Sequence, residues 1–217
     1  MNDTIFYKIQ NAYMLPYEKV IDKEFMDLYD KTNEIIASSR IYFVCRLRSK
    51  GFLFNRFSKP EVLYVGETFD KENRFYRHEK ILKATTLKEP KDKLVVYFLH
   101  IRFSYLGLNT FYNNPMEIFN EIKDLNSKTS VRLLERLYIK LFNPILNESH
   151  NDNNVIEDNL VQKKLIDNSI HYVNLDIGMN ESLFNFTGGK RAEKHDIYTF
   201  NLTNNEMTFG HPLLELL

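Results

Sequence analysis

Residues 63–80, LYVGETFDKENRFYRHEK, contain four residues whose types could form a chemical site. Tyr64 and Gly66 lie at the end of an apolar, strand-like run, and Arg74 and His78 follow it on a predicted helix. Guanidinium groups bind anions, and tyrosine and histidine side chains exchange protons. On a regular helix, Arg74 and His78 are one turn apart and lie on the side that faces the protein. The ordinary alternative is a basic helix with one partly buried histidine.

Glu135 is a further candidate, because it stands in the predicted helix 130–142 as a carboxylate on an apolar face. Helical periodicity places it about 40° from Val131, which belongs to that face. A carboxylate there must be paired, protonated or bound to a metal. An ion pair with Arg132, at the edge of the face, is the alternative that stays open.

The order of these residues along the chain resembles the motif of the GIY-YIG nucleases. That motif has a Gly-Ile-Tyr strand, a Tyr-Ile-Gly strand, Arg-x-x-x-His on a helix, a Glu on a later helix and an Asn that follows a Pro. The matching residues here are Arg40-Ile41-Tyr42, Tyr64-Val65-Gly66, Arg74, His78, Glu135 and, after Pro144, Asn147. The resemblance spans about residues 41–147. It departs from the motif at Arg40, where the family has Gly.

The resemblance implies a metal-dependent hydrolysis of DNA phosphodiester bonds. By this resemblance Glu135 holds one Mg²⁺, for which Mn²⁺ could substitute, and Arg74 binds the scissile phosphate. Tyr42 is then the general base, with Tyr64 and His78 assisting in proton transfer or positioning. Because the pKa of an unperturbed tyrosine is about 10, such a base needs cations nearby.

The resemblance also predicts how the site is assembled. Strands 41–47 and 61–67 should be antiparallel neighbours with their tyrosines on one face. The Glu135 helix should bring its carboxylate to within roughly 10 Å of the other site groups, the span of a shared metal and phosphate. Gly66 is expected where the backbone passes close to the site. Asn147 either ties the Glu135 helix to the sheet or contacts phosphate.

The expected fold class is α+β, with a small, three-stranded, mainly antiparallel sheet flanked by helices. Predicted strands are 41–47, 61–67 and 93–103, and predicted helices are 16–37, 71–84, 115–125 and 130–142. After these come a predicted helix at 155–167 and strands at 169–177 and 195–201. The expected division is an N-terminal helical segment (1–39), a nuclease core (40–148) and an acidic C-terminal appendage (149–217) that dimerises or closes the core.

The composition fits an ordinary globular protein, with 43% hydrophobic and 27% charged residues. A membrane span and a signal peptide are not expected, and the single Cys45 excludes an internal disulfide framework and a Cys-rich zinc site. A cytoplasmic location is therefore predicted. The net charge is zero, yet residues 40–90 hold 12 Lys/Arg and 6 Asp/Glu, a local +6. A basic field of this kind attracts polyanions, so DNA is the expected partner, with a homodimer left open.

Within the family, a stand-alone restriction or phage-defence endonuclease is the interpretation adopted. Two alternatives remain from other classes of protein. One is a module that keeps the fold and binds nucleic acid without cleaving it. The other is a protein–protein adaptor that uses the acidic appendage.

Overall fold

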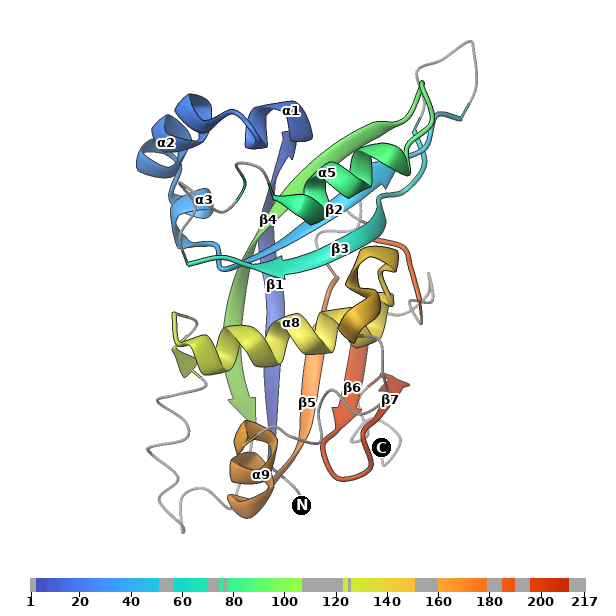
Figure 1. Ribbon diagram of the computed structural model, residues 1–217. Helices are drawn as coiled ribbons and strands as arrows, with labels where there is room; N and C mark the ends of the chain where they lie inside the picture. The colour runs from blue at the N-terminus through green and yellow to red at the C-terminus, as the bar shows by residue number, and fades with distance from the viewer. Residues whose placement is uncertain are drawn as a thin grey trace.

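The computed structural model describes residues 3–50, 57–69, 75, 78–106, 123–124, 126–150, 160–178, 185–189 and 196–210. Its main element is a curled, seven-stranded sheet with the strand order β3-β2-β4-β1-β5-β6-β7 (Figure 1). The strands are β1 (Asp3–Pro16), β2 (Ile41–Leu47), β3 (Glu61–Glu67), β4 (Lys93–Leu106), β5 (Ile170–Asp176), β6 (Ile197–Asn201) and β7 (Glu206–Phe209). Neighbouring strands are antiparallel except for β1 and β5, which are parallel, so the sheet is mixed.

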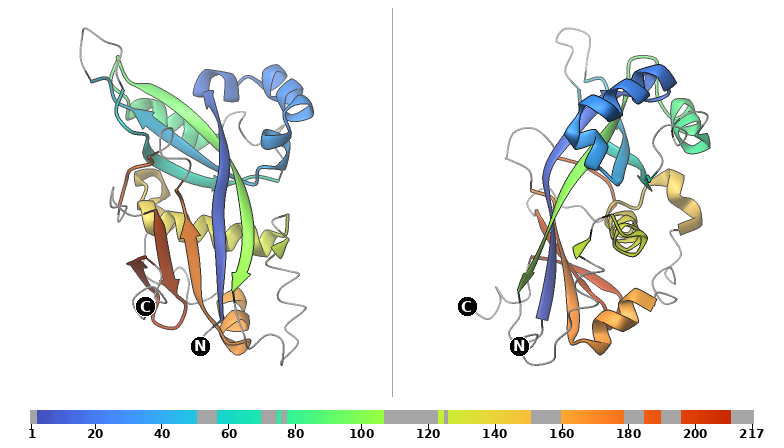
Figure 2. Two further views of the ribbon diagram at one scale, coloured as in Figure 1. Left: turned by 180° about the vertical axis from the view of Figure 1, so that it is seen from behind. Right: turned by 90° about the vertical axis from the view of Figure 1, so that its left-hand side faces the viewer.

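Helices cover this sheet on both faces (Figure 2). They are α1 (Tyr17–Val20), α2 (Lys23–Thr32), α3 (Glu34–Ser38), α5 (Glu79–Thr86), α8 (Lys128–Phe142) and α9 (Leu160–Asp167), with a 3-10 helix η1 (Ile145–His150) after α8. Alternation along β2 divides the interior into two cores. Phe43 packs with α8 and α9 in what we call the α8 core, and Tyr42 packs with α1, α2, α3 and α5 in the tyrosine core.

The expected fold class is wrong, because the sheet is seven-stranded, curled and mixed instead of small, three-stranded and mainly antiparallel. The antiparallel set β3-β2-β4 exists, and the predicted strands 41–47 and 61–67 coincide with β2 and β3. However, this set is one end of a seven-stranded sheet, because β1 pairs with the free side of β4 and then with β5. The predicted strands 169–177 and 195–201 correspond to β5 and β6, which extend the same sheet.

The missing strand is β1, which occupies residues 3–16 where no strand was expected. Its buried residues Ile5, Tyr7 and Ile9 alternate with exposed or partly exposed ones, as a half-buried strand requires. The register then shifts at a bulge between Ile9 and Asn11. Because a bulge moves the buried positions to the other parity, the alternation is too short to stand out in the sequence.

The predicted helix 16–37 is also wrong, because three short helices replace it. The Asp22 carboxylate accepts a hydrogen bond from the Phe25 N–H and starts α2. Asn33 ends α2 in an extended conformation, and its side chain accepts hydrogen bonds from the Ile35 and Ile36 N–H groups to start α3. Asn33 therefore interrupts the helix, whereas the apolar periodicity of the sequence predicts that it continues.

Other helices differ mainly at their ends. The predicted helix 130–142 matches α8, which begins two residues earlier, at Lys128. Helix 155–167 is observed as α9 from Leu160, and residues 151–159 lie outside the described residues. Most of the predicted helix 115–125 lies outside them as well. Strand β7 was not predicted; it follows a turn in which Asn205 has a φ of 59°.

Candidate functional site

Tyr42 and Tyr64 come from adjacent strands and lie on the same face of the sheet. Strands β2 and β3 are antiparallel neighbours, as predicted, and in the observed register Tyr42 lies opposite Gly66 and Val44 opposite Tyr64. Both rings belong to the tyrosine core, and their centroids are 6.0 Å apart. Tyr42 is fully buried and Tyr64 is 8% exposed. The sequence therefore places this pair correctly.

His78 joins the two tyrosines from the start of α5. Its Nε2 atom lies 3.3 Å from the Tyr42 hydroxyl, within hydrogen-bond distance, and its ring centroid is 5.6 Å from that of Tyr64. His78 is only partly exposed, so the contact is sheltered from water. The three side chains form one cluster of groups that can hold or pass a proton.

The predicted helix 71–84 places His78 wrongly within a helix. His78 has φ −66° and ψ 113°, an extended conformation, and α5 begins at the next residue, Glu79. His78 is therefore the residue before the helix and not part of it. Arg74 lies outside the described residues, and its predicted role stays a prediction.

Aromatic side chains that the sequence did not single out fix the Tyr42 ring. The Phe75 ring meets it edge-on with centroids 4.9 Å apart, and Phe98 of β4, opposite Tyr42 in the register, lies at 6.5 Å. Phe75 and Phe98 are buried and pack on each other at 5.5 Å. The signal for Phe98 was its place in strand 93–103, but its partner depends on the register between β2 and β4.

Gly66 allows the Tyr42 hydroxyl to lie directly against the β3 backbone. A Cβ atom at position 66 would be 2.5 Å from the Tyr42 hydroxyl oxygen and 2.6 Å from Cε1 of Tyr64. Both distances are far below van der Waals contact, and the packed rings cannot move away easily. The predicted close passage of the backbone at Gly66 is confirmed.

Replacing Gly66 with Ala is expected to destabilise the fold by about 1–3 kcal/mol, the usual cost of overpacking a filled site. The added methyl group would push Tyr42 away from His78, so any activity that uses this pair should fall as well. Urea unfolding followed by circular dichroism measures the stability. An alanine variant as stable as the wild type would show that the tyrosine core is loosely packed at this point.

Asn147 closes the outer edge of β3. Its side-chain oxygen accepts a hydrogen bond from the Val65 N–H, and its amide nitrogen donates to the Val65 carbonyl, both at 2.9 Å. The side chain is 2% exposed. It is brought there by the left-handed turn at Asn143 (φ 44°) that ends α8 before η1. Of the two predicted roles for Asn147, tying the α8 segment to the sheet is the one the structure supports.

The variant Asn147→Leu is expected to lose about 2–4 kcal/mol of stability. The replacement leaves the N–H and carbonyl of Val65 without these partners in a buried place, and each orphaned group costs about 1–3 kcal/mol. The exposed Asn126, replaced by Leu, is a matched control that should change stability little. Equal losses in the two variants, measured by urea unfolding, would contradict the bonding role.

Glu135 lies on α8, beside the edge strand β3 rather than above the tyrosines. The helix contacts β3, as does α5, and Figure 1 shows β3 between the two helices. Glu135 is partly exposed, while Val131 and Ile139, one turn away on either side, are buried. The buried residues of α8 belong to the α8 core, on the opposite face of β2 from Tyr42. The predicted convergence of α8 and Tyr42 on one face of the sheet is therefore wrong, and a shared site requires the Glu135 carboxylate to reach around the β3 edge.

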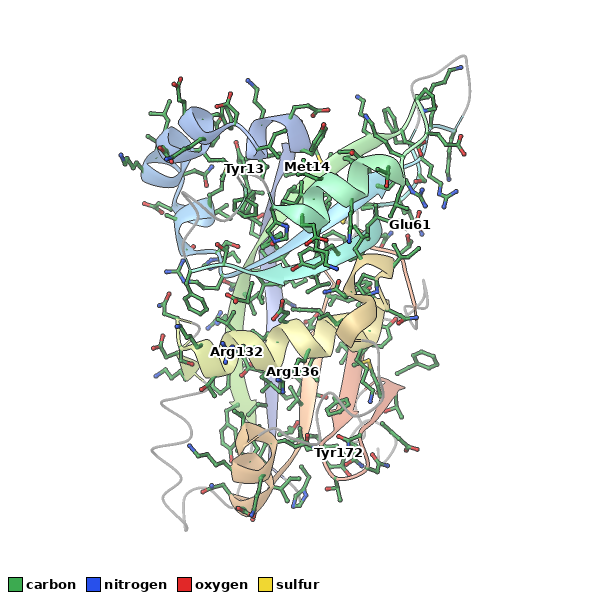
Figure 3. The ribbon with its side chains drawn as sticks, viewed as in Figure 1. Tyr13, Met14, Glu61, Arg132, Arg136 and Tyr172 are labelled. Carbon is green, nitrogen blue, oxygen red and sulfur yellow. The ribbon has the colours of Figure 1, made fainter. Side chains whose placement is uncertain are left out.

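Glu135 is not a free carboxylate, although an ion pair with Arg132 is not seen among the described residues. Arg132 is exposed and Arg136 is partly exposed along α8 (Figure 3), and neither forms an ion pair within that part of the chain. The described residues also contain no cluster of three or more His, Cys, Asp or Glu side chains able to hold a metal. One carboxylate alone suits Mg²⁺, which usually keeps several water ligands.

None of the helices in the described ranges is both long and apolar enough to cross a membrane. Comparisons with models of protein families, with curated proteins and with solved structures found no match.

Proposed function

We propose that the protein is a Mg²⁺-dependent endonuclease that hydrolyses phosphodiester bonds in DNA. The observation that carries this proposal is the contact of the Tyr42 hydroxyl with His78 Nε2, directly above Gly66 and beside Tyr64. These are the residues through which the sequence resembles the GIY-YIG nucleases, and they come from three separate segments.

In this proposal Tyr42 and His78 act together as the proton acceptor. The ionised Tyr42 oxygen would accept the proton of the attacking water, and His78 Nε2, 3.3 Å away, would hold that oxygen in position. The Phe75 and Phe98 rings hold the Tyr42 hydroxyl in place. Tyr64, whose ring lies beside those of Tyr42 and His78, would orient the phosphate.

Charge on the phosphate is balanced by Arg74 and Glu135 in this proposal. Arg74 would donate hydrogen bonds to phosphoryl oxygens, as guanidinium groups do. Glu135 would hold Mg²⁺, which when bound supplies Lewis-acid stabilisation of the developing charge. The position of α8 beside β3 supports this role. Because β3 is the edge strand of the sheet, a side chain on α8 can reach past it toward the other face.

A second candidate is a nucleic-acid-binding module that does not cleave. The burial of Tyr42 favours this binding module, because a buried tyrosine has no direct contact with the water that it would have to deprotonate. Incubation of supercoiled plasmid with the purified protein, with Mg²⁺ or with EDTA, separates the two. Nicked or linear DNA formed only with Mg²⁺ supports the nuclease. Binding in EDTA without cleavage in Mg²⁺ supports the binding module. A protein that neither binds nor cleaves DNA supports the adaptor.

A further inference from the structure

A cavity of about 170 Å³ lies on the α8 side of the sheet, away from the tyrosine core. Its apolar part is formed by Ile41 at the start of β2, Leu99 and Ile101 of β4, and Val131 and Leu134 in the first turns of α8. These five side chains are at most 9% exposed, so the floor is apolar and packed. A cavity of about 150 Å³ is large enough for a benzene ring.

Arg40 gives one side of this cavity a positive charge. One guanidinium nitrogen, Nη1, donates to the Ala37 carbonyl at 3.1 Å and to the Ser39 carbonyl at 3.4 Å, and Nε is buried away from the cavity. The guanidinium therefore reaches a ligand through its outer N–H groups. Arg40 also stands where the GIY-YIG motif has Gly, so the nuclease proposal gives it no role.

The remaining polar groups at the cavity also suit an anion. The Ser38 hydroxyl and His100 Nδ1 are 3.5 Å apart, and the exposed Asn126 lies just before the start of α8. The first turn of α8 contains no acidic residue, and its dipole adds partial positive charge, although Ser127 already accepts from the Ser130 N–H and the Asp124 carboxylate accepts from the Asn126 N–H. No Asp or Glu is among the described residues that line the cavity.

We propose that this cavity binds a small carboxylate that carries an apolar ring or branched chain. The apolar group fills the space over Val131 and Leu134, and the carboxylate pairs with the Arg40 guanidinium near the start of α8. A volume of about 170 Å³ suits a group of the size of a benzene ring. This site is on the other core from Tyr42 and His78, and it does not depend on the proposed nuclease activity.

Titration of the full chain with benzoate, followed by calorimetry, tests the site, with benzamide as the neutral molecule of the same shape. Benzoate is expected to bind in the millimolar range, and benzamide at least about tenfold more weakly, since the charged hydrogen bond to Arg40 is lost. Arg40→Gln should weaken benzoate by a similar factor. Arg102→Gln removes an exposed arginine that lies two residues after His100 and does not line the cavity, and it should have no effect.

The variant Asn126→Asp is expected to fold normally, because Asp has nearly the same side-chain shape as Asn and position 126 is exposed. A negative charge at the mouth of the cavity should weaken benzoate binding and leave benzamide unchanged. Absence of benzoate binding to the wild type overturns the proposal. Equal affinities for benzoate and benzamide, or unchanged benzoate affinity in both Arg40→Gln and Asn126→Asp, overturn it too.

Discussion

Replacing Tyr42 with Phe is expected to slow Mg²⁺-dependent plasmid cleavage by about 10²–10⁴-fold, the range for losing a general base. The change removes one oxygen atom, the one that lies 3.3 Å from His78 Nε2, and leaves the ring in its contacts with Phe75 and Phe98. The fold and DNA binding should therefore persist. Single-turnover cleavage rates, with binding measured separately in EDTA, give the two quantities.

Tyr138 offers a matched control on the other side of the sheet. Its hydroxyl is buried without a hydrogen-bond partner among the described residues, and burial raises its pKa, so it stays protonated. Tyr138→Phe should cleave at the wild-type rate and be as stable or slightly more stable, because it removes an unpaired buried polar atom. Similar losses of cleavage in both variants would show that Tyr42 acts only through stability.

Glu135→Gln is expected to lower Mg²⁺-dependent cleavage by at least about 10³-fold, because a metal contributes several kcal/mol to the transition state. Gln keeps the size of the side chain and removes the negative charge, so α8 should stay folded. Calorimetric titration with Mn²⁺ should show loss of binding in the same variant. Both measurements therefore report on one carboxylate.

Glu79→Gln is the control for this loss of charge. Glu79 lies at the start of α5, exposed, and is paired with Lys83. Its replacement should leave both cleavage and Mn²⁺ binding unchanged. A Glu135→Gln protein that cleaves at the wild-type rate removes the metal role, and one that unfolds assigns Glu135 to the structure of α8 instead.

The part of the site on regular strands could be predicted from the sequence. Tyr42, Tyr64 and Gly66 follow from strand pairing and alternation, because a period of two fixes which side chains share a face. His78 was predicted near them but on the wrong kind of backbone, because no local signal showed that the helix begins at Glu79. The position of Glu135 relative to the tyrosines depends on how α8 packs against the edge strand β3. Hydrophobic periodicity in the sequence does not predict this packing.

The size of the sheet could not be predicted for a related reason. The short alternation of β1 ends at its bulge, and its pairing with β4 and β5 joins segments that have no sequence signal in common. Asn147 shows the same limit: its type and its position after Pro144 were visible, but its partner Val65 is 82 residues earlier.

The central position of β1 has a consequence for how the chain folds. The Thr4 hydroxyl donates to the Tyr172 carbonyl, across 168 residues, and β1 is the only link between β4 and the β5-β6-β7 set among the described strands. During synthesis, β1 therefore cannot pair its second edge until β5 (Ile170–Asp176) has been made. Folding rates fall as such distant contacts accumulate. Until β5 arrives, the exposed edge of β1 is where nascent chains would associate with one another.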